Sequence, residues 1–183
     1  MKQIIGLAGT FSGGKDTYAA HLKAQYGYRH VSTGDLVREI AMKEHGSVER
    51  PVLHEVANKW RHEHGAGVFA KLALEGSKPV AITGIRSLGE AKMIRENDGI
   101  LVFIDAPIEI RYKRMIKRAR DNETAISLEE FTAREEKEWY SGDSDADFNL
   151  RDIKRMSDIL LDRDYSLEEF LRVLDAELGL SGS

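Results

Sequence analysis

The sequence predicts an α/β fold in which a parallel five-stranded sheet is flanked by helices. Two observations carry this prediction. Short, almost continuous apolar runs at residues 4–8 and 100–104 are typical of strands buried on both faces of a parallel sheet. Such runs alternate with helical patterns along the whole chain. The 183 residues are enough for one hydrophobic core, so we expect a single domain over residues 1–183.

The first half of the chain supplies three of the expected strands, at residues 4–8, 28–31 and 79–82. A helix should follow the first strand and end at Gly27, and a second should run from a Ser32 or Thr33 cap to Gly46. A long helical excursion opened by Pro51 then separates the second and third strands, with a break near residues 65–67 and a further helical stretch at 68–74.

The second half repeats the alternation. Ser87 should cap a helix that reaches residue 96, the strand at 100–104 follows, and a helix is expected over 107–120. Pairs of Ser and Glu three residues apart form capping boxes before helices at 128–139 and 167–178. Residues 141–147 are small and acidic and predict a loop, and residues 159–161 predict the fifth strand.

Composition limits the choice of partners. The chain is 42% apolar and 32% charged, and its net charge of −4 provides no basic field for a nucleic acid polymer or a membrane. It contains no cysteine, which excludes disulfides and thiolate zinc sites. We see no secretory signal and no membrane-spanning run, so the expected location is the cytoplasm.

The segment from Gly9 to Lys15 matches G-x-x-x-x-G-K between a predicted strand and a predicted helix, which is the context of a phosphate-binding loop, or P-loop. Its glycines let backbone N–H groups surround phosphate oxygens, and the lysine can reach the β- and γ-phosphates of ATP. The expected ATP-binding residues are Gly9, Thr10, Phe11, Ser12, Gly13, Gly14, Lys15, Asp16 and Thr17.

The position after the lysine departs from the motif. The usual Ser or Thr, a ligand of Mg²⁺, is Asp16 here, followed by Thr17. Because Mg²⁺ accepts carboxylate ligands, Asp16 is a candidate metal ligand for Mg²⁺ bound with ATP. The alternative is that Asp16 only complements the dipole at the start of the helix.

Residues 31–38, V-S-T-G-D-L-V-R, extend the pattern. Together with the P-loop they resemble the opening of nucleoside monophosphate kinases such as adenylate kinase. The resemblance implies that Thr33 lies beside the acceptor base, that Asp35 belongs to the acceptor site, and that Arg38 binds the acceptor phosphate. It also implies an acceptor-binding insert at about residues 33–76.

The T-G-I-R segment at residues 83–86 resembles the family's D-G-F-P-R, whose arginine holds the acceptor phosphate, so Arg86 takes that role by resemblance. Thr83 replaces the family's aspartate, which leaves the metal's anionic partner open between Asp16 and Asp35. Trp60-Arg61 resembles the insert of some deoxynucleotide kinases. Arg61 is either an acceptor contact or an exposed helix position.

The expected helix at 107–120 carries six cations, and Arg111, Arg114 and Arg118 share one face of it. By resemblance, Arg114 and Arg118 are the lid arginines that bind donor phosphates and stabilise transition-state charge, in a lid at about residues 119–140. Arg134 is a weaker candidate for this clamp. A solvated basic face is the alternative. Residues 158–162 and 166–170 resemble the C-terminal part of dephospho-CoA kinases.

The sequence therefore predicts a P-loop kinase that uses ATP with Mg²⁺ to phosphorylate a nucleoside or deoxynucleoside monophosphate, with catalytic Lys15, Arg86, Arg114 and Arg118. One alternative is a dephospho-CoA kinase, whose hydroxyl acceptor would need a base such as Asp35. Another is a nucleotide-binding regulatory protein without turnover, which Thr83 favours.

Overall fold

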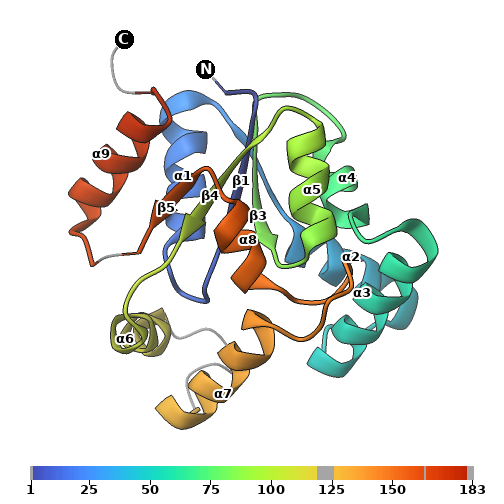
Figure 1. Ribbon diagram of the computed structural model, residues 1–183. Helices are drawn as coiled ribbons and strands as arrows, with labels where there is room; N and C mark the ends of the chain where they lie inside the picture. Colours follow the sequence, from blue (N-terminus) through green and yellow to red (C-terminus); the bar gives the residue numbers. More distant parts are fainter. Residues whose placement is uncertain (1, 119–125, 163, 181–183) are drawn as a thin grey trace.

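The predicted sheet is present in the computed structural model, which describes residues 2–118, 126–162 and 164–180 (Figure 1). Its strands are β1 (Ile4–Gly9), β2 (Arg29–Ser32), β3 (Val80–Ile85), β4 (Ile100–Ile104) and β5 (Ile159–Leu161). Their order is β2-β3-β1-β4-β5, and all neighbours pair in parallel. The carboxyl ends of the strands therefore lie at one edge of the sheet, where open α/β sheets bind ligands.

Helices fill the connections. They are α1 (Lys15–Tyr26), α2 (Thr33–His45), α3 (Arg50–His64), α4 (Val68–Leu74), α5 (Leu88–Glu96), α6 (Ile108–Arg118), α7 (Leu128–Trp139), α8 (Leu150–Met156) and α9 (Leu167–Glu177). None of these described helices combines the length and the apolar character that a membrane crossing requires.

The two faces of the sheet carry different helices. On one face, side chains of β1 such as Ile5 and Leu7 pack against Leu22 of α1 and Leu174 of α9. On the other face, the core is closed by residues of α4, α5 and α8. Because successive side chains of a strand point to opposite faces, β1 contributes to both clusters, as a central strand should.

Two satellite clusters support the ligand-binding edge. Helices α2, α3 and α4 share a small core that includes Val37, Val56 and Phe69, within the segment predicted as the insert. Helices α6 and α7 share another that includes Met115 and Phe131. Phe11 of the P-loop packs against this second cluster, so α6 and α7 are in contact with the loop. Residues 119–125 of the predicted lid lie outside the described part of the chain.

Two details differ from the sequence prediction. Strand β3 continues to Ile85, so Thr83 and Gly84 belong to the strand instead of following it. Helix α8 was not expected. Its start is capped by Asn149, whose side chain accepts a hydrogen bond from the Asp152 amide, and Leu150 and Ile153 bury its apolar side. A helix of only two turns gives a weak periodic signal, which is why the sequence did not reveal it.

Candidate active site

The P-loop connects β1 to α1 at the ligand-binding edge of the sheet. Gly9 has a φ of 132°, and a Cβ atom there would lie 1.9 Å from the carbonyl oxygen of Ile104 in β4. Gly14 has a φ of 121° immediately before α1. Both positions therefore require glycine for the path of the backbone, as a nest of inward-facing N–H groups does.

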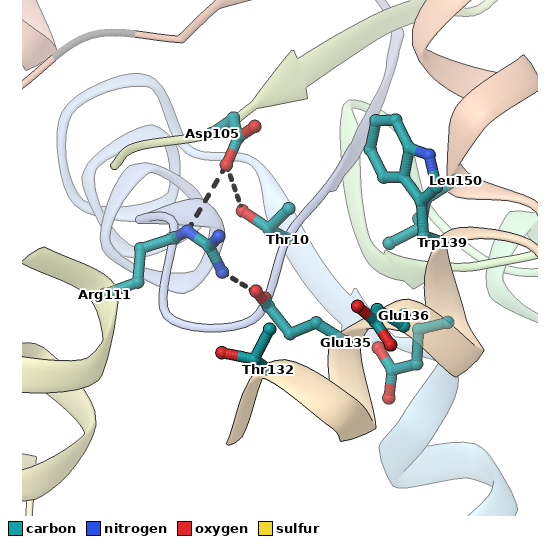
Figure 2. Close-up of a pocket in the computed structure, with 9 residues that line it drawn as sticks. Thr10, Asp105, Arg111, Thr132, Glu135, Glu136, Trp139 and Leu150 are labelled. Carbon is teal, nitrogen blue, oxygen red and sulfur yellow. Dashed lines mark hydrogen bonds and ion pairs between the residues drawn. The ribbon is translucent and has the colours of Figure 1, made fainter. Parts of the chain in front are cut away.

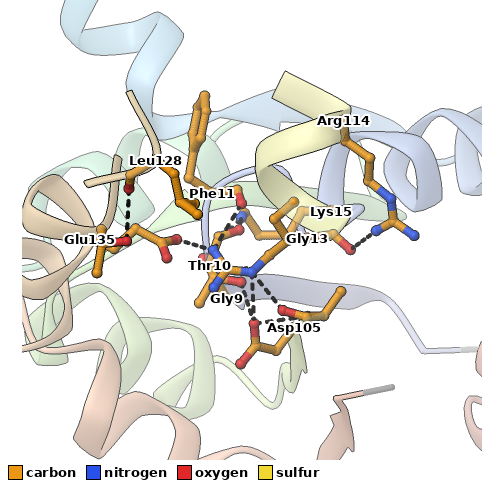
Figure 3. A network of polar contacts seen from close by, with 12 residues as sticks. Gly9, Thr10, Phe11, Gly13, Lys15, Asp105, Arg114, Leu128 and Glu135 are labelled. Carbon is orange, nitrogen blue, oxygen red and sulfur yellow. Dashed lines mark hydrogen bonds and ion pairs between the residues drawn. The ribbon is translucent and has the colours of Figure 1, made fainter. Parts of the chain in front are cut away.

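Lys15 folds back over this loop (Figure 3). Its Nζ donates to the carbonyl oxygen of Gly9 at 2.9 Å and to that of Thr10 at 2.5 Å. Burial and, to a smaller extent, the charge of Arg86 lower the pKa of Lys15 to about 8, while the charges of Asp16 and Glu138 oppose the change. The ammonium group is thus partly desolvated and surrounded by mixed charge, where an incoming phosphate would be a favourable partner.

Asp105, directly after β4, ties the loop to its neighbours (Figure 2). Its Oδ1 accepts a hydrogen bond of 2.6 Å from the Thr10 hydroxyl and one of 2.8 Å from the Ala106 amide. Arg111 of α6 lies 3.4 Å from the same oxygen and also contacts the Glu135 carboxylate of α7. This network borders a small, partly open cavity of about 270 Å³ between the loop and α7.

The arginines of α6 do not form a simple solvated face. Arg111 is buried, and its Nε donates to the carbonyl oxygen of Ala106 at 2.6 Å, so it anchors the helix. Arg114 is more exposed and reaches the loop, with Nη1 at 3.5 Å from the carbonyl oxygen of Gly13 and Nη2 at 3.4 Å from Asp164. Arg118 ends α6, and its side chain lies outside the described part of the structure.

A larger cavity of about 650 Å³ opens beside the P-loop. Its walls come from α2, α3 and α7, from the end of β3, and from Phe11 of the loop. Much of the wall is apolar, as in small-molecule sites generally. Five arginines line it, namely Arg38, Arg50, Arg61, Arg86 and Arg134. They accompany two carboxylates of α7, Glu135 and Glu138.

Most of the predicted acceptor residues line this cavity, but Asp35 does not. Thr33 lines it, although its hydroxyl donates to the carbonyl oxygen of Gly84 at 2.8 Å. Arg38 and Arg86 also line it. Asp35 is not among the lining residues. Its carboxylate accepts a hydrogen bond of 2.7 Å from Arg38, and its side chain is 67% exposed.

Arg86 is oriented by two contacts that the sequence did not predict. Its Nη1 donates to Glu138 of α7 at 2.9 Å, and its guanidinium carbon lies 5.8 Å from the centre of the Phe148 ring. Its backbone N–H donates to the Glu90 carboxylate at 2.9 Å. Glu90 is itself fully buried and forms the capping box of α5 with Ser87. Of these three contacts, only the one with Glu90 had a signal in the sequence, namely the Ser–Glu spacing of the capping box.

The possible metal ligands are sparse. Asp16 and Thr17 are exposed in the first turn of α1. Thr83, at the position of the family's aspartate, pairs with His30 at 2.9 Å, and burial lowers the pKa of that histidine. Over the described residues, no group of three or more His, Asp or Glu side chains could hold a metal ion. The donor set fits a Mg²⁺ ion that takes one carboxylate and otherwise binds nucleotide phosphates and water.

Residues 6–132, from β1 through the P-loop to α7, match the family model described as AAA domain. The chain therefore belongs to this family of P-loop proteins, and more closely to the UPF0200 proteins. A UPF0200 protein of Thermococcus kodakarensis is 31% identical over 155 residues, which cover 79% of this chain and 80% of the relative.

Two further proteins show the range of the similarity. A UPF0200/UPF0201 protein of Archaeoglobus fulgidus is 26% identical over 92% of this chain, which spans only 53% of that relative. Shikimate kinase from Bacteroides thetaiotaomicron has the same fold, with a TM-score of 0.63 over 98% of this chain and all of the other, at 13% sequence identity. The fold is thus that of P-loop kinases.

Proposed function

We propose that this protein transfers the γ-phosphoryl group of ATP to a nucleoside or deoxynucleoside monophosphate and releases the diphosphate. The observation that carries the proposal is the cavity of about 650 Å³ next to the P-loop. It combines apolar walls with several arginines, which suits an acceptor that has a flat apolar base and an anionic end.

On this proposal the P-loop, residues 9–17, binds the triphosphate through its backbone N–H groups. Lys15 leaves the carbonyl groups of Gly9 and Thr10 and pairs with the β- and γ-phosphates. Arg114, which already contacts the loop, offsets the charge that develops during transfer, and Arg118 serves the same purpose. Mg²⁺ bound with ATP would neutralise phosphate charge, and Asp16 in the first turn of α1 is the proposed carboxylate ligand.

The acceptor phosphate lies between Arg38 and Arg86 in this scheme. No general base is needed, because a monophosphate with a second pKa of about 6 is already a nucleophilic anion at neutral pH. A hydroxyl acceptor such as dephospho-CoA would need one. Asp35, the candidate base, pairs with Arg38 instead of lining the cavity, and this supports the monophosphate.

A coupled assay for ADP release tests the function. The purified chain is given ATP and Mg²⁺ with each common ribo- and deoxyribonucleoside monophosphate in turn, and with dephospho-CoA. Stimulation by a monophosphate, absent in Lys15→Met, is the expected result. Stimulation by dephospho-CoA alone would favour the hydroxyl kinase, and tight ATP binding without transfer to any acceptor would favour the regulatory protein.

A further inference from the structure

Arg61 of α3 is a buried cation in the wall of the large cavity. Its side chain is only 6% exposed, although its neighbours His62, Glu63 and His64 are exposed. Its guanidinium carbon lies 5.4 Å from the ring centre of Phe69 and 5.6 Å from that of Phe148. The two aromatic rings remove the guanidinium from water, so the idea that Arg61 is an exposed helix position is wrong.

The hydrogen bonds of this guanidinium are incomplete. Nη2 donates to Oε1 of Glu90 at 3.3 Å, a long contact for a buried ion pair. Among the described residues, nothing accepts a hydrogen bond from Nε or Nη1, and both nitrogens are buried. Buried N–H groups without an acceptor are costly and uncommon in folded proteins, so these two point to a ligand.

The carboxylate of Glu90 does not satisfy the remaining N–H groups of Arg61. The other carboxylate oxygen of Glu90 already accepts from the amides of Arg86 and Ser87. The Arg86 guanidinium lies 5.8 Å from the same Phe148 ring that covers Arg61. Two guanidinium groups thus flank one aromatic side chain. Besides Glu90, a second carboxylate lies nearby, that of Glu138, which pairs with Arg86. An uncharged ligand that displaced Glu138 would leave Arg86 without a charged partner.

We propose that Arg61 binds the phosphate of the acceptor together with Arg86, while the apolar walls of α2 and α3 contact the base. This inference rests on the proposed function and adds to it. The acceptor is selected by its phosphate at Arg61, which lines the cavity and is already desolvated. Arg38, which is 53% exposed and paired with Asp35, then contributes at the rim.

The first experiment uses the wild-type protein, because loss of Arg61 would also leave Glu90 buried without its ion pair. The Nε–H signals of the arginines are recorded by NMR and that of Arg61 is assigned with Arg61→Lys. A non-hydrolysable ATP analogue is added first to occupy the P-loop, and nucleoside monophosphates, the matching nucleosides and inorganic phosphate are then titrated. We expect the Arg61 signal to shift with a monophosphate and not with its nucleoside. An Arg61 signal unchanged by every phosphate-bearing probe at millimolar concentration would overturn the proposal.

The second experiment measures binding by calorimetry. The dissociation constant of the responding monophosphate should rise about 10- to 100-fold in Arg61→Gln, the usual weight of a charge-assisted hydrogen bond. Affinity for the ATP analogue should stay unchanged. Lys59→Gln is the matched control, because it removes a cation from the same helix at a side chain that is 50% exposed. Equal monophosphate affinity in folded Arg61→Gln and Lys59→Gln would contradict the role of Arg61.

These readouts separate the inference from the proposed function. A monophosphate that binds through Arg61 but is never phosphorylated would refute the kinase and retain the phosphate subsite. A monophosphate that is phosphorylated equally well by Arg61→Gln would retain the kinase and refute the subsite.

Discussion

The carboxylate of Glu138 in α7 accepts a hydrogen bond of 2.9 Å from the guanidinium of Arg86 at the end of β3. The charge of the same carboxylate opposes the lowering of the pKa of Lys15 by burial. An acidic side chain of α7 thus lies among the cations that a phosphate would need. On the proposed function, the acceptor phosphate displaces the Glu138 carboxylate from Arg86.

Removal of this carboxylate should therefore favour the ligand. In Glu138→Gln we expect monophosphates to bind about 2- to 5-fold more tightly, since a partly exposed ion pair contributes at most about 1 kcal/mol. Calorimetric titration measures the change. Glu129→Gln, an exposed position in the first turn of the same helix, is the control. Weaker binding in Glu138→Gln would show that the carboxylate helps the ligand instead of competing with it.

The lowered pKa of Lys15 predicts a pH dependence for ATP binding. In the free protein, Lys15 loses its proton as the pH rises through about 8, whereas the bound triphosphate favours the charged form and raises this pKa. Binding must then take up a proton above pH 8. The association constant should fall with increasing pH above 8, by up to about tenfold per pH unit.

Calorimetry at pH 8.5 in buffers of different ionisation enthalpy measures this proton uptake directly. Competing groups are few: the chain contains no cysteine, and burial raises the pKa of Tyr18 and Tyr28 away from this range. Binding without proton uptake between pH 8 and 9 would mean that Lys15 keeps its proton in the free protein.

Much of the fold was predictable from sequence, because central parallel strands are short apolar runs that the P-loop and the capping boxes delimit. The P-loop residues were predictable because their motif occupies consecutive positions in the sequence. The partners of Arg61 and Arg86 were not. Phe148 follows the predicted loop at residues 141–147 and belongs to no predicted helix or strand, and Glu138 belongs to a helix rich in acidic residues.

Such contacts join residues far apart in the chain, and no periodicity encodes them. The burial of Arg61 shows the difficulty. Its neighbours in sequence, including two exposed histidines, are those of a surface helix, and only the packing of Phe69 and Phe148 encloses it. Asp35 is the opposite case, a motif residue that was expected to belong to the acceptor site. Its carboxylate pairs with Arg38 and does not line the cavity.

Glu90 should be a stability determinant as well as a support for the site. Its carboxylate accepts from Arg61 and from the amides of Arg86 and Ser87, and it is fully buried. Glu90→Ala leaves Arg61 buried without a counter-charge, so we expect unfolding to require about 3–5 kcal/mol less. Urea denaturation measures the loss. Glu96→Ala, exposed near the end of the same helix, should change stability little, and equal stability of the two variants would contradict this role.

Asp175 of α9 joins three side chains of the P-loop helix. It accepts from Tyr18 at 2.9 Å and from Tyr26 at 2.8 Å, and it contacts His21 at 2.8 Å. Tyr18 in turn packs edge-on against Phe170, whose ring lies 3.1 Å from where a Cβ on Gly14 would be. The cluster therefore holds α9 against α1 and against the last glycine of the P-loop.

Asp175→Ala leaves the buried Tyr18 hydroxyl without its acceptor, which should lower the free energy of unfolding by about 1–3 kcal/mol. Because Phe170 then loses its fixed position beside Gly14, the affinity for ATP should fall as well, whereas affinity for the acceptor should not. Urea denaturation and separate titrations with an ATP analogue and a monophosphate measure the three quantities. Glu177→Ala, exposed on the same helix, is the control. A variant that is destabilised but binds ATP normally would show that α9 supports the fold without tuning the P-loop.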